Sequence, residues 1–192
     1  MKPLVEFHKV GIHLDFKPQN LIVFEKAEKE KPKKFSSFKR EEKVIKLIDF
    51  DESVQYSEKK LMVKLPNDFS GYTQEYAAPE LDENLRAGIN VEATSKMDIW
   101  SAGITILRNF HSKWNEMPEI AILVGNMLSR DPEKRMSAKG VIDYLEGKLS
   151  LKNLRDLMKK KGMKWIPIDI DDDPSVQIVL QDLVKRTKIC DH

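Results

Sequence analysis

The stretch that decides the fold is Gly11-Ile-His-Leu-Asp-Phe-Lys-Pro-Gln-Asn-Leu-Ile-Val-Phe24. Its polar residues His13, Asp15, Lys17 and Asn20 stand between apolar ones, and the apolar run 21–24 follows. This pattern predicts a loop that leads into a short buried strand. Such a loop can aim an imidazole, a carboxylate, an ammonium and a carboxamide at one point.

The amino-acid composition limits the class of protein, its partners and its location. The 192 residues are 41% hydrophobic and 33% charged, with a net charge of +2, which is typical of one soluble globular domain and gives no reason to expect a nucleic-acid partner. The single cysteine, Cys190, permits no internal disulfide and favours a reducing compartment. No apolar run reaches membrane-spanning length, and the N-terminus has no signal-peptide pattern. We therefore expect no membrane partner and a cytoplasmic or nuclear location.

A second strand is expected at 44–50, and it ends in Asp49-Phe50-Asp51. We expect it to pair with strand 21–24 as a hairpin. Between them, residues 25–43 are rich in Lys, Arg and Glu, which predicts a charged, solvated insertion. Its Phe35 and Phe38 leave a docking role open as the alternative.

Further segments follow downstream. Residues 52–72 are expected to form an irregular polar loop, which leads into Thr73-Gln-Glu-Tyr-Ala-Ala-Pro-Glu80. Residues 97–110 are apolar on nearly every face, so this helix should lie in the middle of the domain. Asp98 near its start should then be buried and require several hydrogen-bond donors.

The segment Met127-Leu-Ser-Arg-Asp-Pro-Glu-Lys-Arg135-Met-Ser137 predicts a turn between two helices. Ser137 is a suitable N-cap for a helix to Leu145, with Gly147 beyond its end. Further helices are expected around 151–158 and 174–188.

Taken in order, these segments resemble the motifs of eukaryotic-type protein kinases. The first resembles the catalytic loop H-R-D-L-x-x-x-N, and the others resemble D-F-G, A-P-E, D-x-W-S-x-G and L-x-x-D-P-x-x-R-x-S/T. Small-molecule kinases such as aminoglycoside phosphotransferases share the first two but lack the other three. The resemblance implies a mainly α (α+β) fold, the C-terminal lobe of a protein kinase, with a central buried helix and a short hairpin.

The expected domains are a kinase lobe at 1–147, with the insertion 25–43 in its hairpin, and a helical extension at 148–192. The N-terminal lobe is expected to be absent. Only fourteen residues precede Asp15, and no two glycines have the spacing of a glycine-rich loop. The chain alone is therefore expected to lack the lid that covers ATP.

The resemblance also implies roles for individual residues. Asp15 would accept the proton of a substrate hydroxyl, and Lys17 would neutralise charge on the transferring phosphate of ATP. Asn20 and Asp49 would hold Mg²⁺. The residues expected to support this site structurally are His13, Phe50, Thr73, Glu80, Asp98 and Arg135, with Arg135 paired to Glu80 and Asp98 bonded to the loop backbone.

Lys17 and Thr73 match the serine/threonine type, so the expected function is transfer of the ATP γ-phosphate to a protein hydroxyl. Two positions depart from the family pattern. Leu14 replaces an arginine that senses phosphorylation, and Asp51 replaces the glycine of D-F-G. The alternative function is a catalytically inactive, kinase-like scaffold or binding protein. The protein substrate is not identified.

Overall fold

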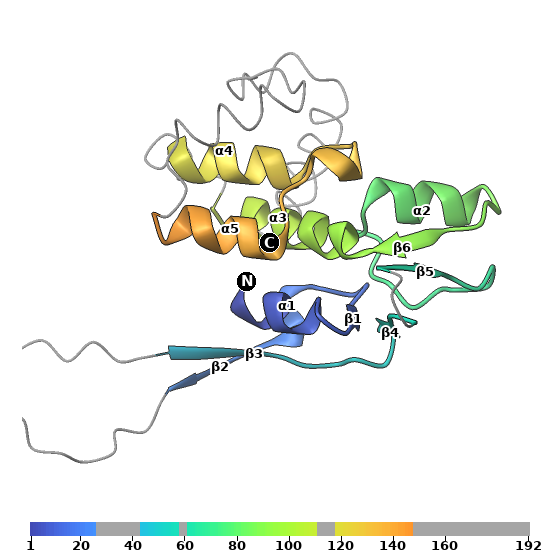
Figure 1. The fold of residues 1–192 in the computed structure, drawn as a ribbon, viewed down its shortest axis with the longest axis horizontal. Helices are drawn as coiled ribbons and strands as arrows, with labels where there is room; N and C mark the ends of the chain where they lie inside the picture. The colour runs from blue at the N-terminus through green and yellow to red at the C-terminus, as the bar shows by residue number, and fades with distance from the viewer. Residues whose placement is uncertain (26–42, 58–60, 111–117, 148–192) are drawn as a thin grey trace, which may run out of the picture.

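The computed structural model describes residues 1–25, 43–57, 61–110 and 118–147 (Figure 1). Most of the predicted insertion at 25–43 and the whole predicted extension at 148–192 lie outside these ranges. Among the described residues, no helix has both the length and the apolar character needed to cross a membrane.

The described part of the chain is a mixture of helices and short strands. In chain order these are α1 (Lys2–Phe7), β1 (Gly11–Ile12), η1 (Pro18–Asn20), β2 (Leu21–Glu25), β3 (Lys43–Leu47), β4 (Val54–Gln55), β5 (Met62–Lys64), α2 (Pro79–Arg86), β6 (Glu92–Thr94), α3 (Ser95–Phe110), α4 (Pro118–Met127), η3 (Pro132–Lys134) and α5 (Ala138–Leu145). The strands form three antiparallel pairs, β1 with β4, β2 with β3 and β5 with β6.

Helix α3 is the centre of the molecule, as its apolar sequence predicts. It contacts α4, β1, β6 and η3, and the ribbon shows it running through the middle of the body (Figure 1). Its residues from Met97 to Ile104 are all buried. Because a helix that is apolar all round can only be stable when covered on every side, this burial follows directly from its composition.

Two groups of buried side chains pack on opposite faces of α3. Ile99 and Ala102 belong to a group that joins α1, α4 and α5, with Leu4, Met127 and Val141 as members. Trp100 and Ile104 belong to the other group, which includes Leu14, Leu65, Leu81 and Val91. The first group holds the helices together, and the second holds the loops and α2.

The predicted hairpin is present, but the prediction that strand 21–24 is buried is wrong. β2 and β3 pair in the register Leu21 with Leu47 through Glu25 with Lys43, and the hairpin extends away from the helices (Figure 1). Leu47 is buried and Leu21 packs beside it, whereas Val23 and Phe24 are exposed. Only the base of the hairpin reaches the core, and that is why its outer residues stay exposed.

The prediction that residues 52–72 form only an irregular loop is also wrong. β4 pairs with β1 and β5 pairs with β6, so this part of the chain is bonded to the body at two places. Both strands are only two or three residues long. Strands this short give no period-2 pattern that could be recognised in the sequence.

The end of the helical core agrees with the sequence. The Ser137 hydroxyl accepts a hydrogen bond from Gly140 N at 3.1 Å and caps α5, which ends at Leu145. Gly147 follows with φ 72°, a left-handed conformation that glycine adopts without strain.

The central position of α3 leads to a stability prediction with a matched control. Ile99→Ala removes a side chain that is 0% exposed, so it should lower the free energy of unfolding by about 2–5 kcal/mol. Ile89→Ala makes the same change at a side chain that is 55% exposed and should cost less than about 0.5 kcal/mol. Urea unfolding of the two variants compares them, and similar losses would show that α3 is not the core.

Candidate functional site

The loop from His13 to Asn20 is held in place by a carboxylate on another element. Asp98 of α3 is 0% exposed and accepts hydrogen bonds from the backbone N–H of His13 and of Leu14, both at 2.8 Å. The predicted contact between Asp98 and the loop backbone is therefore present. These bonds secure Leu14 at φ 66°, a conformation that is unfavourable for a bulky residue.

Asp15 is the next polar residue of the loop, and its carboxylate has three partners. Oδ1 accepts the backbone N–H of Thr73 at 2.9 Å, and Oδ2 lies 2.6 Å from Lys17 Nζ. The Asn20 amide donates to the Asp15 backbone oxygen at 2.9 Å and to Oδ2 at 3.3 Å. Lys17 Nζ also donates to Thr73 Oγ1 at 2.8 Å. The structure thus brings together four of the residues expected at the site.

These contacts determine the ionisation of Asp15. Burial on its own would raise the pKa of the carboxyl group. Hydrogen bonds from Lys17 and Thr73, together with the Lys17 charge, outweigh burial and lower the pKa below its usual value. Asp15 is therefore a carboxylate at neutral pH, with its charge opposed by one ammonium.

Asp49 reaches the same region through the hairpin. Ile48 N donates to Asn20 O at 3.0 Å, so the residue before Asp49 is bonded directly to Asn20. Asp49 is exposed, has φ 63°, and makes no hydrogen bond or ion pair with the described residues. Since Asn20 donates its amide nitrogen to Asp15, its side-chain carbonyl oxygen is not used in that contact. Two oxygen donors of the kind that hard cations prefer therefore come from neighbouring positions.

His13 and Phe50 help to position the backbone next to Asp49. His13 is 0% exposed, and its Nε2 lies 3.1 Å from Ile48 O, which ties the loop to the residue before Asp49. Phe50 and Phe7 pack against the His13 ring, with centroid distances of 5.3 and 6.1 Å. The backbone that precedes Asp49 is thus positioned by an aromatic cluster.

One residue of this site was missed in the sequence. His8, which follows α1, places its Nε2 2.9 Å from Asp98 Oδ2 and adds a third contact to the buried carboxylate. A histidine that follows a short helix has no sequence pattern that would mark it as the partner of a buried carboxylate. The only available signal was the expectation that Asp98 needs several donors.

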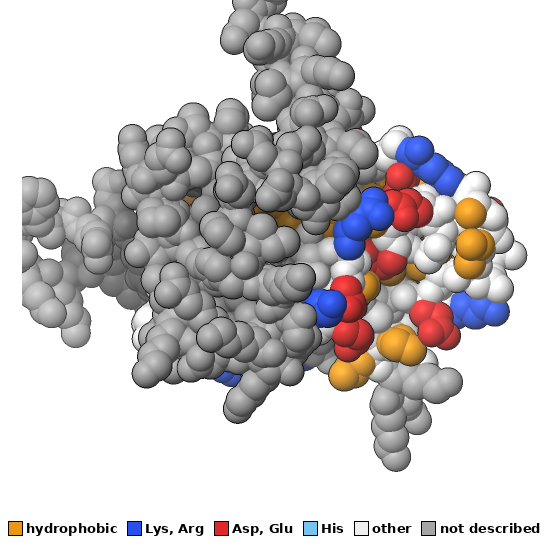
Figure 2. All heavy atoms as spheres, turned by 90° about the horizontal axis from the view of Figure 1, so that it is seen from above, with side chains coloured by type: hydrophobic (Ala, Val, Ile, Leu, Met, Phe, Trp, Pro, Cys, Tyr) orange, Lys and Arg blue, Asp and Glu red, His pale blue; other side chains and the backbone are white. Residues whose placement is uncertain are grey.

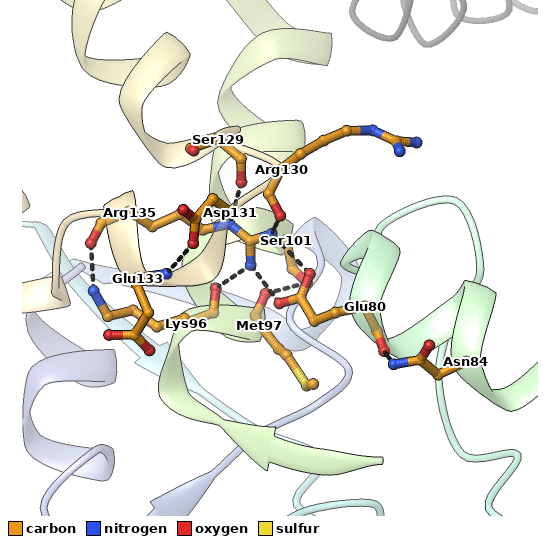
Figure 3. A network of polar contacts seen from close by, with 10 residues as sticks. All are labelled: Glu80, Asn84, Lys96, Met97, Ser101, Ser129, Arg130, Asp131, Glu133 and Arg135. Carbon is orange, nitrogen blue, oxygen red and sulfur yellow. Dashed lines mark hydrogen bonds and ion pairs between the residues drawn. The ribbon is translucent and has the colours of Figure 1, made fainter. Parts of the chain in front are cut away.

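The predicted ion pair between Glu80 and Arg135 is also present (Figure 3). Arg135 is 0% exposed and donates to both carboxylate oxygens of Glu80, at 2.6 and 2.7 Å. It donates further to Ser129 O at 2.6 Å and Lys96 O at 3.1 Å, and it lies over the Trp100 ring at 5.0 Å. This network joins α2 to the turn before α5 and fixes the end of the segment that carries Thr73.

The outer surface near α2 has a different character. On the face shown in Figure 2, basic and acidic side chains lie next to one another over the described surface. Exposed pairs such as Arg130 with Glu83 at 2.9 Å and Arg86 with Asp82 at 3.1 Å are of this kind. Mixed charge of this type contributes little to stability or to attraction of a charged polymer.

Comparisons with known proteins identify similar sequences. A family model for the protein kinase domain matches residues 4–114. The chain is also 25% identical over 189 residues to the serine/threonine-protein kinase ArnS of Sulfolobus acidocaldarius. That match covers 76% of this chain but 29% of the relative, so the chain spans under a third of the relative's length.

The buried Arg135 and the exposed Arg130 each pair with a glutamate, and the contrast between them gives a second prediction. Arg135→Ala strands Glu80 without its partner and should lower the free energy of unfolding by roughly 3–5 kcal/mol. Arg130→Ala removes an exposed pair and should cost less than about 1 kcal/mol. Chemical denaturation of both variants measures the difference. Equal losses would contradict a shielded pair at Arg135.

Asp15 gives a third prediction, which concerns pH. Its pKa is lowered on folding, so its contribution to stability is present above the unfolded pKa and is lost as the pH falls through the folded one. The difference in unfolding free energy between wild type and Asp15→Asn should be constant near neutrality and shrink below about pH 4. Unfolding curves recorded at several pH values test this. A difference that does not change down to the acid limit would contradict it.

Proposed function

The chain belongs to the protein kinase family, because the kinase-domain match covers more than half of its residues, and we propose that it is the catalytic lobe of a serine/threonine kinase. The observation that carries this proposal is the set of contacts around Asp15. One carboxylate is held between Lys17, Asn20 and the backbone of Thr73, on a loop secured by a buried Asp98.

We further propose that residues 1–147 correspond to the C-terminal lobe. The described part is built around one buried helix, and its hairpin is exposed beyond the base, as expected of a surface that another lobe would cover. The matched range also includes the catalytic-loop, D-F-G-like and A-P-E-like segments.

The roles of the residues follow from their contacts. Asp15 is ionised and has the geometry to orient a substrate hydroxyl and accept its proton. Lys17, 2.6 Å from Asp15, would place a positive charge where the transferring phosphate lies. Because both groups are held before any substrate arrives, little reorganisation is needed during the reaction.

ATP with Mg²⁺ is the cofactor that the family implies, and the oxygen donors fit it. Asp49 offers a carboxylate without a partner among the described residues, and Asn20 offers a carbonyl oxygen. No group of three His, Cys, Asp or Glu side chains in the described ranges could hold a metal by itself. Mg²⁺ is usually held by one or two carboxylates together with substrate phosphates, so one carboxylate and one amide oxygen are donors of the right chemical kind. When bound, the ion would neutralise charge on those phosphates.

The serine/threonine type is supported by the bond from Lys17 to Thr73 at 2.8 Å. It joins the loop to the segment that ends in Ala78-Pro79-Glu80, so the two sides of the substrate site are tied together. The relative ArnS, which carries the same designation, is consistent with this proposal.

The fourth prediction tests catalysis. With this lobe joined to a lobe that carries a glycine-rich loop and its lysine, the chain should transfer radiolabelled phosphate to a general protein substrate. Asp15→Asn keeps the shape but removes the accepting charge, so the rate should fall by roughly 10²–10⁴. Asp143→Asn, the same change on α5, should leave the rate unchanged.

One result of this assay would contradict the proposed catalytic function. If the folded, joined wild type is no faster than its Asp15→Asn variant, the catalytic function is excluded. A scaffold or binding function would then replace it.

A further inference from the structure

The segment that carries Thr73 is attached to the body by backbone pairs and side-chain contacts within the chain. Its described parts, residues 54–57 and 61–76, are called the activation segment here. Their attachment to the body extends beyond the bonds of Thr73 to Asp15 and Lys17. Three independent kinds of contact make it: backbone pairing, apolar burial and existing ion pairs.

Backbone pairing attaches the segment at two places. β4 pairs with β1, extended by a bond from Tyr56 N to Val10 O at 3.0 Å. β5 pairs with β6, and Leu65 N donates to Val91 O at 2.9 Å just beyond the pair. Because β6 leads directly into α3, the second attachment connects the segment to the central helix.

Apolar burial reinforces the second attachment. Leu65 is 2% exposed and belongs to the same buried group as Leu14, Leu81 and Val91. Phe69 and Tyr72 pack against this group with stacked rings, and the Tyr72 hydroxyl donates to Asp82 at 3.0 Å. By contrast Leu61, the residue before β5, is 71% exposed. Leu65 is therefore the most deeply buried side chain in the described part of the segment, and Phe69 and Tyr72 add to its anchoring.

Two cations that contact the segment from the described body are already paired. Lys17 lies against Asp15, and Arg108 lies 2.9 Å from Glu75 and over the Tyr76 ring. Leu14, which faces the segment from the loop side, is apolar and 3% exposed. A phosphate placed on the segment could gain Lys17 or Arg108 only by competing with its existing pair.

We propose that Leu65 and the β5–β6 pair form an apolar latch, which holds Thr73 against Asp15 whether or not the activation segment is phosphorylated. The latch itself stands on contacts within the chain. Its consequence, phosphoryl transfer without prior activation, rests on the proposed function.

Amide hydrogen exchange tests the latch without any measurement of activity. In the phosphatase-treated chain, the amides of β5, β6 and Thr73 should be protected. Leu65→Ser should speed their exchange by about 10- to 100-fold, as expected from the burial of one leucine side chain. Leu61→Ser is the matched control and should change little. The α5 amides report whether each variant is folded, and the milder Leu65→Ala replaces the serine variant if it is not.

Each outcome decides the question. Selective loss of protection in β5, β6 and Thr73 with Leu65→Ser, while α5 stays protected, supports the latch. Equal effects of the two serine variants would overturn it. So would an unprotected segment in the phosphatase-treated wild type that becomes protected after phosphorylation. None of these results depends on whether the protein transfers phosphate, so failure of the latch and failure of the proposed function are distinguishable.

Discussion

The constraint on which the rest depends is the burial of one carboxylate, Asp98, in the first turn of the apolar helix α3. A fully buried charge is tolerated only when several donors surround it. Here the donors are the backbone N–H groups of His13 and Leu14 and the His8 side chain. The central helix can therefore be buried only if the loop folds onto it in one conformation. The contacts that allow α3 to be buried are therefore the same contacts that position the loop carrying Asp15.

A second charge contact, between Glu80 and Arg135, fixes the chain on the other side of Thr73. The buried Arg135 and the partly buried Glu80 form the second charge network, and their pairing fixes the start of α2, just beyond the activation segment. Thr73 lies between these two fixed points and bonds to Asp15 and Lys17. The polar groups of the site are thus positioned by rigid elements on either side, which is how preorganised electrostatic catalysis is achieved.

Much of the helical core and of the site could be predicted from the sequence, because a buried helix and a buried charge each leave a recognisable sequence pattern. The all-apolar run of α3 required a buried helix, and Asp98 within it required hydrogen-bond donors. The pairing of Glu80 with Arg135 was implied by the resemblance to protein kinases. The hairpin could be located but its exposure could not, since an apolar run looks the same whether or not another surface covers it. β4 and β5 were missed because their pairing is set by long-range backbone bonds. His8 was missed for a similar reason, because its partner is distant in sequence.

The central claim is that Asp98 positions the loop and, through it, the contact between Asp15 and Thr73. The most direct measurement is the exchange rate of the His13, Leu14 and Thr73 amides in wild type and in Asp98→Asn. The account predicts slow exchange of all three in wild type and fast exchange of all three in the variant, while the Val141 amide of α5, which bonds to Ser137 O, stays protected. If His13 and Leu14 exchange fast but Thr73 keeps its protection, the loop is not what positions the site, and the account is wrong.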